Sequence, residues 1–193
     1  GLNQLAKIFN SASKNLDEKD RHFEYLTLNV SKYHNDTEVT LEDGAFGDIT
    51  FEILNAYGIK KINSNAFNKT KSELGFFYCW TCDLVNEPPK YDLQKVFGQI
   101  PGLQTLEIRV NISELPSSAF NIHQLSKLSS LQILSERNLT VKSGAFQNLN
   151  QKIFINLVSK QLKFEKEAFK MSSGLSVDLS STNFNGKYKL IHH

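Results

Sequence analysis

Residues 96–120 read "VFGQIPGLQTLEIRVNISELPSSAF", and this stretch decides the fold. Its apolar residues Leu103, Leu106 and Ile108 are followed by Asn111. Together they reproduce the spacing L-x-x-L-x-L-x-x-N, which is typical of repeats of about 20 to 29 residues. This spacing predicts a short strand whose alternate side chains point into a core. We expect Asn111 to turn inward after the strand, where its amide would bond backbone groups that the turn leaves unpaired.

The rest of the chain repeats this unit. Ala-Phe pairs recur at intervals of 21 to 30 residues, counting Phe97 as a variant, and end at Phe46, Phe67, Phe120, Phe146 and Phe169. An apolar anchor stands five positions before the phenylalanine of each pair, at Leu41, Ile62, Leu115, Val141 and Phe164. A strand-like stretch precedes each block, so we expect each phenylalanine to fill the gap between coils opposite the strands. Because no unit buries its own apolar face, several must stack.

The sequence therefore predicts an α/β fold, a leucine-rich repeat solenoid with a short parallel β-sheet on its concave face. Leu2, Leu5, Phe9 and Leu16 follow an approximately helical period, which predicts a capping helix before the first strand. We place the helical cap at residues 1–22 and an array of about seven units at 23–184. Residues 185–193 form a C-terminal tail, whose two final histidines we interpret as a tag remnant. The alternative, a β-sandwich, would not place Ala-Phe at a fixed phase.

The two cysteines of the chain, Cys79 and Cys82, form a C-x-x-C pair in the third unit. Cys79 falls on the third apolar position of the repeat, and Cys82 on its Asn/Cys position. We therefore predict two inward structural cysteines, either free or joined in a local disulfide. A redox site is the first alternative, but it needs an exposed thiol of low pKa. Zinc is the second, but no other pair of ligands accompanies the cysteines, so we predict no metal site.

Outward residues between the inward ones are the candidate binding residues. They comprise an aromatic patch and a neighbouring polar group, namely Phe76, Tyr78, Trp80, Glu107, Arg109 and Gln132. Tyr, Trp and Arg are favoured at binding hot spots, so we expect a protein or glycan partner here. The insert at residues 86–94, "NEPPKYDLQ", predicts an irregular loop that could add a contact. The register of the second and fifth units is ambiguous by one residue, which would exchange their inward and outward side chains.

Composition and sequons bear on where the protein works. The net charge of +2 gives no electrostatic reason to expect nucleic acid, and no apolar run approaches the roughly 18 residues of a membrane span. Asn-x-Ser/Thr sequons begin at five asparagines, which favours a secreted glycoprotein. We expect Asn111 to stay unmodified because it points inward. The glycosylation candidates are Asn29, Asn35, Asn68 and Asn138.

No catalytic residue and no cofactor is predicted. The chain has no nucleophile-elbow motif and no clustered acids typical of an active site. The sequence favours a non-enzymatic, secreted leucine-rich repeat module that binds a protein or glycan. One alternative is an obligate non-catalytic subunit of a secreted enzyme. A further alternative is a thiol oxidoreductase that uses Cys79 and Cys82.

Two stretches carry a more particular likeness. Residues 96–120, quoted above, and residues 45–67, "AFGDITFEILNAYGIKKINSNAF", resemble a group of secreted arthropod leucine-rich repeat proteins. That group includes the non-catalytic leucine-rich subunit of decapod shrimp luciferase. The likeness extends from "LAKIF" at residues 5–9 to Phe169. The resemblance implies a secreted binding or scaffolding role and no catalysis.

Overall fold

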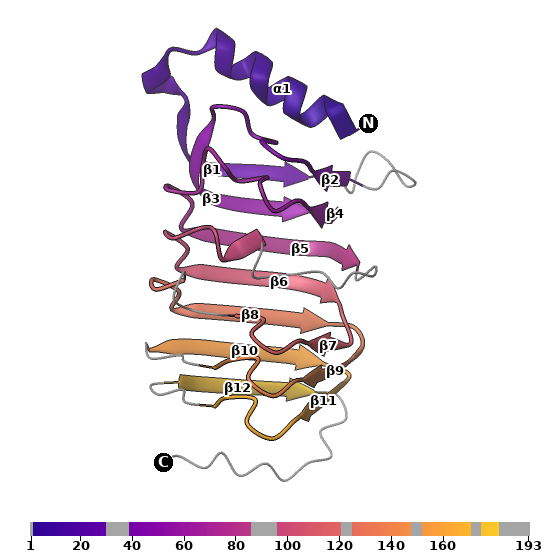
Figure 1. Ribbon diagram of the computed structural model, residues 1–193. Coiled ribbons are helices and arrows are strands. Elements are labelled where there is room, and N and C mark those ends of the chain that lie inside the picture. Colours follow the sequence, from indigo (N-terminus) through magenta and orange to yellow (C-terminus); the bar gives the residue numbers. More distant parts are fainter. Residues whose placement is uncertain are drawn as a thin grey trace.

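One parallel sheet forms the body of the protein. The computed structural model describes residues 2–29, 39–85, 96–120, 125–147, 152–170 and 175–181. Within these residues, seven long strands pair in parallel in the order β1-β3-β5-β6-β8-β10-β12. Their bounds are β1 His22–Asn29, β3 Thr50–Tyr57, β5 Phe76–Val85, β6 Thr105–Asn111, β8 Ser130–Ser135, β10 Ile153–Ser159 and β12 Leu175–Ser181. Figure 1 shows these strands stacked one above another along the molecule.

A short second strand follows five of the long strands. Strands β7 (Glu114–Leu115), β9 (Asn138–Val141) and β11 (Gln161–Phe164) form one small parallel sheet. Strands β2 (Val39–Leu41) and β4 (Ile59–Ile62) form another. Each of these five strands ends on the apolar anchor that the sequence placed five residues before the phenylalanine. The predicted parallel solenoid of repeated coils is therefore confirmed.

Helix α1 (Leu2–Asn15) and the 3-10 turn η1 (Glu18–Asp20) precede the first strand. Figure 1 shows α1 lying across the end of the stack beside β1 and β2. The rings of Phe9 and Phe46 meet edge to face with their centroids 5.3 Å apart, which joins the helix to the first coil. No helix in the described part of the chain is long and apolar enough to cross a membrane.

The phenylalanines of the repeat stack inside the solenoid. Phe46, Phe67, Phe97, Phe120 and Phe146 are all buried, as expected from their phase. Two pairs of these rings stack between successive coils, with centroids 5.8 Å apart for Phe46–Phe67 and 5.6 Å apart for Phe120–Phe146. Aromatic pairs at such distances contribute about 0.5–1.5 kcal/mol beyond the burial of their area. The alanines before the other four rings are buried as well, and Val96 takes this place before Phe97.

A repeated left-handed turn sets the phase of the Ala-Phe pairs. Gly44 and Gly144 precede two of the pairs with φ values of 64° and 68°. Ser118 and Glu167 hold the equivalent positions with φ values of 60° and 65°, although side chains disfavour this region. The turns bond to each other between coils, because Ser118 N donates to Gly144 O at 3.0 Å and Gly144 N donates to Glu167 O at 2.9 Å. The same backbone conformation therefore recurs in successive coils.

The prediction that Asn111 points inward is wrong. Asn111 is half-buried, whereas Val110 beside it is buried, so the alternation along β6 continues one position past the prediction. Ser135, which pairs with Val110 in register, supplies the inward polar group instead. Its hydroxyl donates to Ile112 O at 2.7 Å and accepts from Arg137 N at 3.2 Å. A buried serine thus bonds the backbone of the preceding coil, which is the role expected of the asparagine amide.

One lysine links charges of three successive coils. Lys142 Nζ lies 2.8 Å from Glu165 Oε1 and 3.8 Å from Glu114 Oε2. Ser143 N donates to Glu165 Oε2 at 3.1 Å. The hydrogen bond from Lys142, followed by that from Ser143 N, lowers the pKa of Glu165 below its ordinary value of 4.5. Hydrogen bonding to Glu165 in turn raises the pKa of Lys142.

Glu165→Gln is expected to make the stability of the protein less sensitive to acid. A carboxyl whose folded pKa is lowered stabilises the fold above its unfolded pKa, and this contribution is lost as pH falls through the folded pKa. Because the pair is exposed to solvent, the decrease in Tm at pH 7 should be small. Thermal melts of both proteins at neutral pH and at about pH 3 check this, since the gap should close in acid. An equal gap at both pH values would contradict the assignment.

Candidate binding face

The outer face of the seven-stranded sheet brings most of the predicted site residues together. Tyr78, Glu107, Gln132 and Asn156 occupy the same register position on β5, β6, β8 and β10. We call these four residues the central row. Neighbouring strands lie about 4.8 Å apart, so the row spans about 14 Å along the solenoid. The residues flanking each of them in sequence point into the core and are buried, as are Leu106 and Ile108 around Glu107.

The polar groups of the central row have unused hydrogen-bonding capacity. Tyr78, Glu107 and Gln132 make no side-chain hydrogen bond or ion pair within the described residues. Asn156 Oδ1 is buried and has no hydrogen-bond partner within the part of the chain that the structure describes. A buried polar group left in this state costs about 1–3 kcal/mol. Tyr78, Glu107 and Gln132 are only half-buried, so a ligand can reach their polar atoms.

Glu107 is the electrostatic centre of the row. Its side chain is half-buried, and desolvation raises the pKa of its carboxyl above the ordinary value of 4.5. The predicted neighbour Arg109 does not compensate it, because the guanidinium of Arg109 pairs with Glu136. The face therefore holds a partly desolvated carboxylate without a cation at its side.

Aromatic side chains border the row. Phe76 and Trp80 lie two residues before and after Tyr78, and Trp80 is 39% exposed. Tyr25 and Phe154 are also exposed, on β1 and β10. Asn55 Nδ2 donates to the hydroxyl of Tyr25, which orients that ring relative to its neighbouring strand. The six residues predicted for binding thus lie on three adjacent strands, β5, β6 and β8. Trp80 and Arg109 stand two residues beyond the central-row residues of their strands.

A bulge next to Trp80 changes the interpretation of the cysteines. Cys79 pairs with Ile108, but the next pair is Leu84 with Val110, so residues 80–83 of β5 stand opposite Arg109 alone. Val85, and not Cys82, is therefore opposite Asn111. The assignment of Cys82 to the Asn/Cys position of the repeat is wrong, because a spacing template does not detect an insertion in the strand.

The inward placement of Cys79 is confirmed. Its side chain is 1% exposed and disulfide-bonded, and Cys82 is the only other cysteine of the chain. Redox catalysis needs an accessible sulfur, and that of Cys79 is buried. The bond anchors Cys79, the last position of β5 that pairs with β6 before the bulge, directly beside Trp80.

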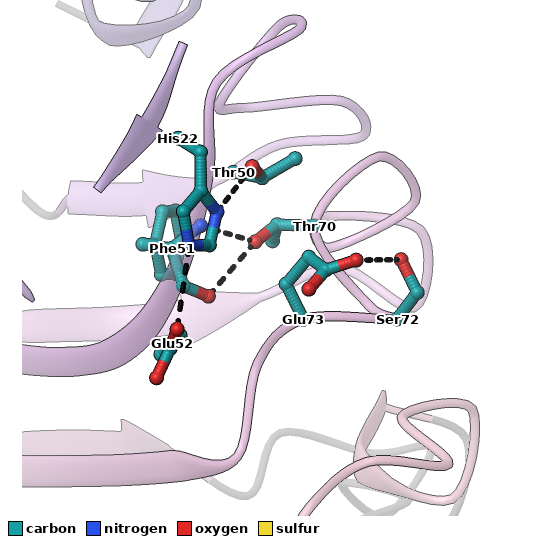
Figure 2. Close-up of polar contacts among 7 residues, drawn as sticks. All are labelled: His22, Thr50, Phe51, Glu52, Thr70, Ser72 and Glu73. Atoms are coloured by element: carbon teal, nitrogen blue, oxygen red, sulfur yellow. Dashed lines mark hydrogen bonds and ion pairs between the residues drawn. The ribbon is translucent and has the colours of Figure 1, made fainter. Parts of the chain in front are cut away.

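A second polar group lies near the first strands. Figure 2 shows His22 between Thr50 and Glu52, with Nδ1 3.0 Å from Thr50 Oγ1 and Nε2 3.3 Å from Glu52 Oε1. The order hydroxyl, imidazole, carboxylate is that of a hydrolase triad. However, the side chains of His22 and Glu52 are 44% and 53% exposed, so water reaches both groups freely. This arrangement lacks a water-excluded site, and we interpret it as a contact between β1 and β3.

The sequence did not identify Asn55 as a residue of the outer face, and it did not place Asn156 beside the predicted binding residues. Asn55 was missed because the register of the second unit was ambiguous, and the buried Phe51, Leu54 and Ala56 now fix it. Asn156 belongs to the face through its register with Gln132, which depends on the pairing of β8 and β10. The insert at residues 86–94 lies outside the described residues.

The sequon asparagines are mostly accessible. Asn29, Asn68 and Asn138 are exposed, and Asn35 lies outside the described residues. Asn111 is half-buried, so the reason given for leaving it unmodified does not hold in full.

No group of three or more His, Cys, Asp or Glu side chains that could hold a metal ion occurs among the described residues. Comparisons with protein families, curated proteins and solved structures found no significant match to this chain.

Proposed function

We propose that the protein is a non-enzymatic, secreted leucine-rich repeat module that binds a protein or glycan on the outer face of its sheet. The observation that carries this proposal is the central row, four adjacent polar side chains with unused hydrogen-bonding capacity beside exposed aromatic rings. Surfaces with Tyr, Trp and polar groups of this kind are favoured in recognition. Arrays of repeats commonly bind along such extended faces.

Burial along the strands supports the leucine-rich assignment. The buried residues Phe51, Leu54 and Ala56 of the second unit follow the spacing L-x-x-L-x-L. The same spacing recurs in the next three units, at Leu74–Phe77–Cys79, Leu103–Leu106–Ile108 and Leu128–Leu131–Ile133. The packing of Leu5, Phe9 and Leu16 against the core supports a capping role for α1. The exposed sequon asparagines are compatible with glycosylation in a secretory pathway.

A double variant of the central row tests the binding face. Tyr78→Ala with Gln132→Ala should lower binding to arrayed glycans and peptides at least tenfold, because both side chains lie at the proposed contact. The matched control is Gln161→Ala with Lys163→Ala on the exposed side of β11, which should bind like the parent. Both variants and the parent would be biotinylated and read on the same printed array. Equal signals from the two variants would contradict the proposal.

An obligate subunit of a secreted enzyme is the second candidate function, since the same face could hold a permanent partner. The native mass of the endogenous protein, measured by light scattering after size-exclusion chromatography, separates the two. A second protein in constant ratio would favour the subunit, and a glycosylated monomer would exclude it.

A further inference from the structure

Charge is divided between the long strands and the rest of the chain. None of the lysines lies in the seven long strands, although the chain as a whole has a net charge of +2. The acidic residues of those strands are Glu24, Glu52, Asp83, Glu107 and Asp178. Arg109 is their single Lys or Arg residue, and it is paired with Glu136. The strands that form the outer face are therefore acidic in a basic protein.

Among these acidic residues, Glu107 has a carboxylate that no lysine or arginine of the described residues pairs with. An ionised carboxylate accepts hydrogen bonds only, and Glu107 receives none from the described residues. Folding desolvates the group without supplying a cation, which is why its pKa rises. Along the same row, Asn156 Oδ1 is a second acceptor that receives no hydrogen bond from the described residues. Both groups lack donors, and an ammonium or guanidinium group supplies donors and positive charge together.

The aromatic residues add to the attraction for a cation. Tyr78 is the in-register neighbour of Glu107, and Trp80 is exposed two residues farther along the strand. Cations interact favourably with the faces of Tyr and Trp rings, by about 0.5–1 kcal/mol at exposed sites and more when desolvated. Ring and carboxylate thus favour the same kind of group at the same place.

We propose that the outer face binds a basic protein segment that places a lysine or arginine side chain on Glu107 and against the ring of Tyr78. This inference rests on the proposed binding function and specifies the chemistry of the partner. The row spans about 14 Å, the length of four to five residues of extended chain. A segment lying along the row would meet Gln132 and Asn156 after Glu107, so its backbone and neighbouring side chains have hydrogen-bond partners. A free amine would use only one of these positions.

Trp80 gives a direct measurement, because it is the only tryptophan of the chain and lies on this face. The probes are three capped octapeptides that alternate glycine with lysine, glutamate or glutamine. The lysine peptide should change the emission of Trp80 in a saturable way at low salt, and added salt should weaken the binding. The glutamate and glutamine peptides should not change the emission.

Glu107→Gln identifies the carboxylate that is responsible. This variant should weaken binding of the lysine peptide at least tenfold, whereas Glu18→Gln, which removes the same charge in η1, should change it less than twofold. Loss of stability would not explain the effect, because a carboxyl with a raised folded pKa destabilises the fold at neutral pH. Glu107→Gln should therefore melt at or slightly above the temperature of the parent.

The possible results separate this inference from the function it rests on. Equal affinity of Glu107→Gln and the parent, or binding of the glutamate peptide, would overturn the cationic assignment. If an arrayed neutral oligosaccharide alters Trp80 emission and the lysine peptide does not, the partner is not basic but the binding face stands. If neither probe responds and the central-row variant matches its control on the array, both proposals fail.

Discussion

Replacing Phe46 by alanine is expected to lower the free energy of unfolding by about 3–5 kcal/mol, because it removes a buried ring at the junction of helix and solenoid. Phe46 is 1% exposed. Its ring centroid lies 5.3 Å from that of Phe9, 4.8 Å from that of Phe51 and 5.8 Å from that of Phe67. No other described ring joins α1 to the first two coils in this way. The cavity would therefore weaken the attachment of the helix as well as the core.

Urea unfolding followed by circular dichroism measures the loss, and hydrogen exchange shows where it occurs. The amides of α1 should lose protection in the variant, since stability in a stack of coils depends on contacts with neighbours. Phe154→Ala is the matched control, because this ring is 41% exposed on the outer face and should cost far less. If both alanine variants lost the same stability, the stacked rings would not be the source of the effect.

Thr70→Val is expected to cost about 2–3 kcal/mol, because it leaves backbone groups of Phe51 without a partner in the core. Figure 2 shows the Thr70 hydroxyl beside Phe51, accepting from its N–H at 3.0 Å and donating to its C=O at 3.3 Å. Pairing of β3 with β5 begins only at Ile53 and Phe76. The Thr70 hydroxyl thus bonds the backbone of Phe51 at a position where β5 does not yet pair with β3. Thr70 is fully buried, so water does not replace it.

Thr70→Ser separates the hydroxyl from the methyl group. Serine keeps both hydrogen bonds and loses one methyl, so its cost should be closer to 1 kcal/mol. Thermal or urea unfolding of both variants checks the order. A serine variant as unstable as the valine variant would mean that packing, and not hydrogen bonding, accounts for Thr70. Because Thr70 has this structural role, the sequon at Asn68 is also explained without a glycan.

Local spacing predicted the features that depend on one coil. Leu103, Leu106 and Ile108 point inward, and the Ala-Phe rings are buried except Phe169, which is partly buried. Both features follow from a repeat whose units cannot bury their own faces. The sequence also predicted the apolar anchors. It did not predict that the short strands ending on these anchors pair into two small sheets. Pairing between short strands depends on how coils stack, and a single unit does not contain that information.

The two wrong predictions, for Asn111 and Cys82, concern positions whose structure depends on contacts between neighbouring coils. Asn111 was expected inward because its amide suits an unpaired backbone, but Ser135 of the following coil already bonds Ile112 O. Cys82 matched a template position by coincidence, because the bulge shifts the register of β5 and β6 beyond Cys79. For the candidate site, residue types were visible in the sequence. The central row depends on register, which only the pairing of strands fixes.

The alternation of buried and outward residues along each strand has an evolutionary consequence. Leu106 and Ile108 are buried in the core, whereas Glu107 between them makes no side-chain hydrogen bond or ion pair with the described residues. Selection can therefore act on the outward positions with little change in foldability, since the two sets of residues are separate along the same strand. A library randomised at Tyr78, Glu107, Gln132 and Asn156 should retain a high fraction of folded members. The scaffold would then accept new recognition surfaces by point substitution alone.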